Sequence, residues 1–217
     1  LPMLPSIGIP TTAGTGSEAQ SFALIAQEKS RQKMACGDRK ARFRTAVLDP
    51  SLVRSAPEHV AAASGMDAIS HAVESYVSTK RNPFSQMLAR ESWRLLEGSF
   101  GEFLSDRSNR KACSQMLLGS HLAGASIENS MLGAAHACAN PLTARYGIPH
   151  GVAVGMMLPG VIQFNSQAED PEVDDLYLEL QNIRSRDGLS LVGQIRELKA
   201  AGAQPESLRE LRVREVD

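Results

Sequence analysis

The stretch GMDAISHAVE, residues 65–74, decides which fold class we infer for this chain. Asp67 and His71 stand four residues apart, so a helix would place both side chains on one face. Their neighbours are mostly small or apolar, and a buried aspartate without a partner among them would be costly. The pair therefore indicates a rigid two-ligand clamp for a metal ion. The same spacing also fits a surface pair, or a core histidine satisfied by the aspartate.

Two further histidines lie in GAAHACANPLTARYGIPHG, residues 133–151. We expect this stretch to begin as a helix and then to break at three positions, Pro141, Gly147 and Pro149. Such a break would let His136 and His150 approach one point. Three imidazoles and one carboxylate suit a divalent transition metal, either Fe²⁺ or Zn²⁺. Alone, His136 fits a core residue and His150 a helix N-cap, so only their occurrence with the first pair favours a metal site.

Helical signals surround these motifs from Ser55 onward. Ser55 can cap a helix and Pro57 suits its first turn, and apolar residues then recur at helical spacing to about Ser78. Six further helices are expected between Gly, Pro, Asn or Asp signals, over about residues 83–97, 110–125, 130–144, 152–164, 173–183 and 190–200. The expected fold class is therefore mainly α.

The first 56 residues differ from the helical region, because their pattern predicts short strands and loops. Apolar or β-rich runs occur at Ser6–Pro10, Phe22–Ala26 and Arg44–Leu48, and the last run ends at a turn signal, Asp49-Pro50. This segment is too short to form a domain of its own. We therefore expect a division into residues 1–56 and a helical domain over residues 57–217.

The bulk properties exclude several classes of partner. Among 217 residues, 42% are hydrophobic and the net charge is −1, which allows a buried core and disfavours a basic surface for nucleic acid or an anionic membrane. No apolar run approaches the roughly 20 residues that a membrane-spanning helix needs, and the start shows no signal peptide. Three scattered cysteines indicate free thiols in a reducing compartment, so we expect a cytoplasmic location.

The segment IPTTAGTGSE, residues 9–18, is a third motif. A strand that runs into Thr and Gly residues can bring backbone N–H groups and hydroxyls against phosphate or sugar oxygens. The pattern matches neither the P-loop nor the dinucleotide fingerprint GxGxxG, and an ordinary loop is its commonest meaning.

Together, three segments resemble the iron-containing (group III) alcohol dehydrogenases: PTTAGTGSE, LDPSLV followed by AAASGMDAISHAVESY, and GAAHACANPLTARYGIPHGVAVGMMLP. The resemblance covers roughly Ile7 to Asn165. It implies the dehydroquinate synthase-like architecture, an α/β nucleotide-binding domain followed by a helical metal domain, with the active site between them. Residues 1–56 would be the last strands of the first domain, and residues 57–217 a helical domain shortened at its C-terminus. The chain would thus be a fragment.

The resemblance also implies roles for individual residues. The metal ligands would be Asp67, His71, His136 and His150. The loop that contacts the cofactor would include Thr11, Thr12 and Thr15. The adenosine and ribose side of the cofactor would be lined by Leu24, Lys33 and Leu48. The implied reaction is NAD- or NADP-linked interconversion of small alcohols with aldehydes or ketones at Fe²⁺ or Zn²⁺, and the full-length protein would be a homodimer.

Two departures from the family pattern bear on activity. Many members carry a further histidine four residues after the third ligand, beside the nicotinamide, where this chain has Asn140. An amide cannot titrate near neutral pH, so a proton relay through this position is in doubt. The glycine-rich segment that binds pyrophosphate is also absent from the 217 residues. A catalytically impaired fragment is therefore one alternative, and a metal-dependent hydrolase is another, because three histidines and an aspartate can also activate water.

Overall fold

The computed structural model describes residues 3–27, 33–167, 171–184, 188–211 and 213. Helices dominate this part of the chain, as expected. They are α1 Glu58–Val77, α2 Pro83–Ser105, α3 Arg110–Ser130, α4 Ala134–Tyr146, α5 His150–Ser166, α6 Pro171–Asn182 and α7 Leu191–Ala201. None of the helices within the described ranges is long and apolar enough to cross a membrane.

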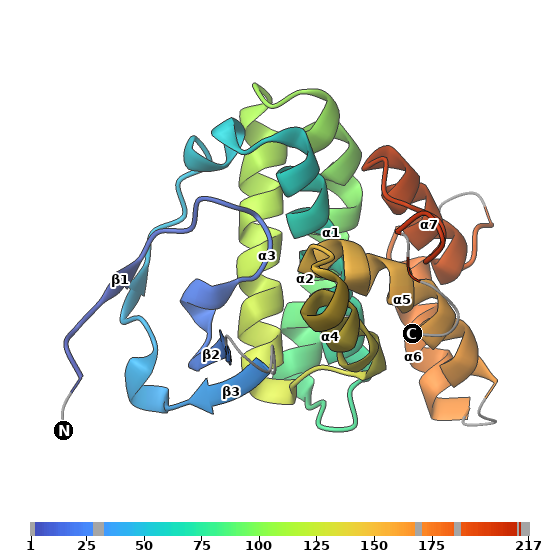
Figure 1. The fold of residues 1–217 in the computed structure, drawn as a ribbon, viewed down its shortest axis with the longest axis horizontal. Helices are drawn as coiled ribbons and strands as arrows, with labels where there is room; N and C mark the ends of the chain where they lie inside the picture. The colour runs from blue at the N-terminus through green and yellow to red at the C-terminus, as the bar shows by residue number, and fades with distance from the viewer. Residues whose placement is uncertain (1–2, 28–32, 168–170, 185–187, 212, 214–217) are drawn as a thin grey trace.

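The centre of the fold is α1, which packs against five other helices: α2, α3, α4, α5 and α6. Because it has neighbours on most sides, most of its residues are buried, polar ones included. Trp93 and Phe100 from α2 and Met116 from α3 fill the core around it without solvent exposure. Figure 1 shows α4 to α7 on one side of α3 and the N-terminal segment on the other. Any polar residue on the inner faces of α1 is therefore enclosed.

Two helices extend further than their sequences suggest. The expected end of α2 was Glu97, before Gly98, but the helix continues to Ser105 because Phe100 and Phe103 carry its buried stripe forward. Their burial outweighs the roughly 1 kcal/mol that a glycine costs inside a helix. In α3, buried Ile127 likewise extends the helix to Ser130, and α4 starts only at Ala134.

The expected break at Pro141 is wrong, because α4 passes through this residue and ends at Gly147 instead. A proline inside a helix leaves the carbonyl four residues earlier, here that of Ala137, without its usual donor. Both Pro141 and Ala137 are exposed, so water can satisfy that carbonyl. The breaks expected at Gly147 and Pro149 are confirmed, and α5 starts directly after them.

The N-terminal segment forms two small two-stranded sheets. Strand β1 (Ile7–Gly8) pairs in parallel with β4 (Thr45–Ala46). Strand β2 (Phe22–Ala26) pairs antiparallel with β3 (Lys33–Gly37), with Phe22 opposite Gly37. Short 3₁₀ turns lie between and after the strands: η1 Ser17–Ala19, η2 Arg39–Ala41 and η3 Leu52–Ser55. The sequence did not suggest β3, because KMACG holds no β-branched or aromatic residue and only its pairing with β2 defines it.

Candidate metal centre

Three imidazoles, from three separate helices, converge on one carboxylate oxygen of Asp67. Asp67 Oδ1 lies 3.5 Å from His71 Nε2, 3.4 Å from His136 Nε2 and 3.7 Å from His150 Nε2. Ligand atoms of Asp67, His71 and His136 all lie within 4.8 Å of one another, which is close enough to share one ion. The structure therefore brings together all four residues that the sequence suggested as metal ligands.

The cluster is buried on three sides and more open at the fourth. The side chains of Asp67, His71 and His136 are between 5% and 7% exposed, whereas that of His150 is 27% exposed. The His71 and His136 rings stack at 4.8 Å, and the His150 ring meets His136 edge-on at 5.4 Å. A small ligand would therefore approach the cluster from the side of His150.

Glu74 of α1 orients His136. One of its carboxylate oxygens, Oε1, accepts a hydrogen bond of 2.6 Å from the Ala135 N–H, and Oε2 accepts one of 3.3 Å from the His136 N–H. The His136 ring also contacts Oε2 through Nδ1, which leaves Nε2 turned toward Asp67. A Cβ on Gly133 would lie 2.8 Å from Glu74 Oε1, so a glycine there leaves room for this contact.

Two glutamates of the helical region, Glu74 and Glu128, are of a type that could serve as the outer partner of a ligating imidazole. The spacing of Glu74 places it on the same face of α1 as Asp67 and His71, and that was the signal for its role. Glu128, in contrast, bonds Ser21 in the N-terminal segment.

His150 is held by the start of α5. The helix begins at His150 after Pro149, as the sequence suggested. Its next residue, Gly151, lies directly against the backbone carbonyl of Ala63, and any side chain there would overlap that carbonyl. Because Ala63 is one turn before Asp67 on α1, this contact sets how far His150 stands from the aspartate.

The surroundings of the cluster keep its Asp67 carboxylate ionised. Burial opposes the charge of Asp67, but the surrounding histidines outweigh burial and hold the pKa of this carboxyl well below its usual range. Burial lowers the pKa of His71 to about 4, although the Asp67 carboxylate opposes this shift. Burial also disfavours the charged form of His136, but its contacts with Asp67 and Glu74 prevail and raise its pKa to about 9.

The residues present fit a metal ion. Asp67 Oδ1 and His136 Nε2 are buried, and neither has a hydrogen-bond partner within the described part of the chain. Their separation of 3.4 Å is too long for a strong hydrogen bond. A divalent ion between them would satisfy both atoms, and one oxygen with three imidazole nitrogens is a donor set that Fe²⁺ and Zn²⁺ accept.

The residues expected to contact a cofactor lie on several elements. In the loop between β1 and η1, Thr11 and Thr15 are exposed and Thr12 is half-buried, whereas Ala13 and Gly14 are buried. The backbones of Leu24 and Lys33 belong to β2 and β3, but their side chains lie outside the described part of the structure. Leu48 packs against the hydrophobic core. Asn140 lies one turn after His136 on α4, with Oδ1 buried and no hydrogen-bond partner for it within the described ranges.

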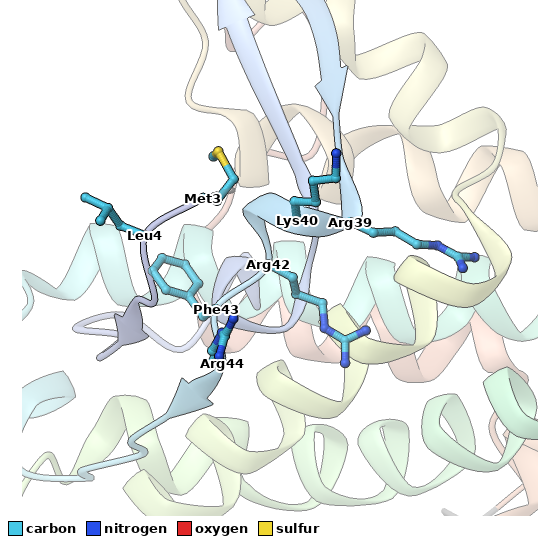
Figure 2. Close-up of a pocket in the computed structure, with 7 residues that line it drawn as sticks. All are labelled: Met3, Leu4, Arg39, Lys40, Arg42, Phe43 and Arg44. Carbon is cyan, nitrogen blue, oxygen red and sulfur yellow. The ribbon is translucent and has the colours of Figure 1, made fainter. Parts of the chain in front are cut away.

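A separate cavity of about 760 Å³ lies in the N-terminal segment. It is lined by Met3, Leu4, Arg39, Lys40, Arg42, Phe43 and Arg44. Figure 2 shows that the basic side chains point in different directions, so they do not converge on one anion. The cavity shares no lining residue with the metal cluster.

Comparisons with known proteins identify the family of this chain. Residues 61–217 match the model of the Fe-containing alcohol dehydrogenase family, C-terminal, and residues 1–50 match that of iron-containing alcohol dehydrogenase. Alcohol dehydrogenase 4 of Saccharomyces cerevisiae is 38% identical over 76% of this chain and 43% of its own length. 1,3-Propanediol dehydrogenase of Citrobacter freundii is 34% identical over 100% of this chain and 57% of its own length.

Solved structures of similar fold indicate the same family. A crystal structure of 1,3-propanediol oxidoreductase superposes with a TM-score of 0.92 at 30% identity, over 100% of this chain and 58% of that protein. Sulfoacetaldehyde reductase from Bifidobacterium kashiwanohense, solved in complex with NAD⁺, superposes with a TM-score of 0.89 at 29% identity, over 98% of this chain and 56% of that protein. The chain thus spans about half the length of the relatives it matches, and it belongs to the iron-containing alcohol dehydrogenase family.

Proposed function

We propose that Asp67, His71, His136 and His150 hold one divalent transition metal, and that this centre serves an NAD(P)-linked conversion between alcohols and aldehydes or ketones. The observation that carries the proposal is the approach of three imidazole Nε2 atoms to one buried carboxylate oxygen. Fe²⁺ is the ion we expect, given the family, and Zn²⁺ suits the same donors.

The residues of the chain prepare the site for this chemistry. Glu74 keeps the His136 Nδ1 proton engaged, so Nε2 of the same ring is directed to the ion. Burial of Asp67 and His71 excludes water from the back of the cluster, while His150 borders its open side. A cation bound there would supply Lewis acidity toward the substrate oxygen, and the nicotinamide would accept or deliver the hydride.

The names of relatives support a small substrate and a nicotinamide partner. One relative is a 1,3-propanediol dehydrogenase, and another is a sulfoacetaldehyde reductase solved with NAD⁺. We therefore propose small alcohols and aldehydes as the substrate class, with NAD to be tested against NADP. The exposed Thr11 and Thr15 and half-buried Thr12 suit contact with the cofactor. Asn140, on the same face of α4 as His136, is proposed to face the nicotinamide.

We also propose a domain division, a location and an oligomeric state for this protein. Residues 1–56 would close an α/β nucleotide-binding domain, and residues 57–217 would form the metal domain, a division supported by the ranges of the two family models. Cys36, Cys113 and Cys138 are all free, which agrees with a cytoplasmic location. A homodimer of the full-length protein is likewise a proposal.

The test begins with metal binding. We expect the purified chain, stripped of metal and reloaded anaerobically with Fe²⁺ or Zn²⁺, to bind about one ion per chain by elemental analysis. His71→Gln should weaken this binding at least about 100-fold, the upper end of what even an outer partner of a ligand contributes. His59→Gln is the matched control, because His59 is an exposed histidine on the same helix. Equal metal content in both variants would refute the site.

The reaction is tested separately on the loaded chain. We expect oxidation of NADH or NADPH when a small aldehyde such as propionaldehyde is added, followed by absorbance. Metal binding without oxidation, together with hydrolysis of a nitrophenyl ester, would favour the hydrolase. Metal binding with neither activity would favour an impaired fragment.

A further inference from the structure

One face of α3 holds the Thr/Gly loop, defined here as residues 11–21. Four residues of the helix contact it, Ser120, His121, Gly124 and Glu128, and their spacing places them on a single face. We infer that this face, the α3 anchor, sets the conformation in which the loop presents its threonines to the cofactor. The inference rests on the proposed function, because that function gives the threonines their role. The anchor residues act through the loop and are positioning residues.

Glu128 makes the strongest contact of the anchor. Its Oε2 accepts a hydrogen bond of 2.8 Å from the Ser21 N–H, and its Oε1 accepts one of 2.7 Å from the Ser21 Oγ–H. Ser21 is buried, and both bonds end on a charged group, which makes them stronger than bonds between neutral groups. The end of the loop, where β2 begins, is therefore tied to α3 at two atoms.

His121 makes a second contact two turns away. Its Nδ1 lies 3.0 Å from Oε1 of Glu18, a residue of η1 that is only 5% exposed. A buried carboxylate needs a partner, and this histidine supplies one from α3. Each partner supplies one glutamate to the other: Glu18 of the loop contacts His121 of the helix, and Glu128 of the helix contacts Ser21 of the loop. Loop and helix therefore hold each other reciprocally.

Between these contacts the two backbones touch. Gly16 has a φ of 59°, in the left-handed region that favours glycine, and it lies on the backbone of Ser120 and Gly124. A Cβ on Gly16 would lie 2.8 Å from the Gly124 Cα, and a Cβ on Gly124 would overlap the Gly16 carbonyl. Any side chain at either position would push the loop away from the helix.

The other side of the loop rests on the helix that carries two of the proposed metal ligands. A Cβ on Gly14 would lie 2.7 Å from the Ser64 Cβ, and Ser64 stands one turn before Asp67 on α1. The loop is thus held between α1 and α3, with Ala13 and Gly14 buried and Thr11 and Thr15 exposed. This arrangement fixes the threonines relative to the metal cluster.

The decisive variant is Gly124→Ala, which adds one methyl group where the loop meets the helix. Gly101→Ala is its matched control, because Gly101 is also inside a helix and a Cβ there meets nothing within 4 Å. Both changes favour the helix itself. We expect the loop amides that donate hydrogen bonds, those of Ala19, Gln20 and Ser21, to exchange hydrogen about tenfold faster or more in Gly124→Ala. The added methyl group displaces the loop and so breaks the charge-assisted contact between Ser21 and Glu128. Gly101→Ala should leave the exchange of these amides unchanged.

Glu128 gives an independent, graded series. Glu128→Ala should expose the Ser21 amide to rapid exchange, whereas Glu128→Gln keeps one acceptor oxygen and should give a smaller increase. Lys111→Ala, a change at an exposed residue about 25 Å before Glu128 on the same helix, is the control. In the variants with a released loop, NADH titrated by fluorescence should bind about tenfold more weakly. Metal content by elemental analysis should equal that of the unchanged chain.

The outcomes separate the anchor from the function. Loop exchange at the original rate in both Gly124→Ala and Glu128→Ala would overturn the anchor. Faster exchange with unaltered NADH affinity would overturn its positioning role. An unchanged chain that binds no NADH would contradict the proposed function instead, while loop exchange would still decide whether α3 holds the loop.

Discussion

The two ends of the proposed active site are built in different ways. The metal cluster sits on α1, α4 and α5, where its ligands are enclosed by packed helices. The Thr/Gly loop belongs to a segment of two-residue and five-residue strands, in which the large apolar residues Ile7, Phe22 and Ile25 remain exposed. The comparison teaches that burial places the ligands, whereas a few specific contacts place the loop. Damage to either region should therefore have a different signature.

Truncating a phenylalanine in each region tests this difference most strongly. Phe100 of α2 is fully buried, so Phe100→Ala should lower the free energy of unfolding by about 3–5 kcal/mol. Phe22 of β2 is 42% exposed and covers Gly37 across the hairpin, so Phe22→Ala should cost about 1 kcal/mol or less. Urea denaturation followed by circular dichroism measures both values. Similar losses for the two variants would show that burial stabilises both regions equally.

Neutralising Glu74, the carboxylate that contacts the proposed ligand His136, should weaken the metal site without affecting the Thr/Gly loop. Glu74→Gln leaves an oxygen that can still accept from the Ala135 N–H, but it removes the carboxylate that His136 Nδ1 contacts. We expect metal affinity to fall about 10- to 100-fold by competition with a chelator. Amide exchange of the Thr/Gly loop should stay unchanged, because Glu74 has no described contact with it. Glu91→Gln, at an exposed glutamate of α2, is the control.

The pH dependence of metal binding should arise in the cluster alone. Without metal, His136 has a pKa of about 9, so near pH 7 it carries a proton on Nε2 that an incoming ion must displace. Affinity should therefore rise up to about tenfold per pH unit between about pH 7 and 9, and then level off. His71, with a pKa of about 4, is already neutral in this range and adds no slope.

The same two pKa shifts have opposite consequences for the stability of the metal-free chain. The folded-state pKa of His136 is raised above 6.5, so its stabilisation is complete below pH 6.5 and disappears as pH rises through about 9. The folded-state pKa of His71 is lowered, so its contribution is complete above pH 6.5 and disappears as pH falls toward 4. Thermal unfolding without metal should show greatest stability near pH 6.5. A stability that stays flat from pH 6 to 9 would contradict the surroundings assigned to His136.

Much of the helical region could be predicted because helix signals are local. The start of α2 at Pro83 follows from Asn82 and the proline after it, and the start of α5 follows from Pro149. The end of α2 was misjudged because Gly98 indicates a stop, whereas the burial of Phe100 depends on neighbouring helices. Strand β3 was missed for a similar reason, since its partner β2 defines it.

The mainly helical fold class, the family and the four residues proposed as metal ligands follow from the sequence, because periodicity and motif spacing are properties of short segments. Three features became visible only in the folded chain: these ligands share one carboxylate oxygen, Glu74 rather than Glu128 orients His136, and α3 holds the Thr/Gly loop. Apart from the Asp67–His71 pair on α1, each of these contacts joins residues between 60 and 110 positions apart. How such residues meet depends on helix packing that no local pattern encodes.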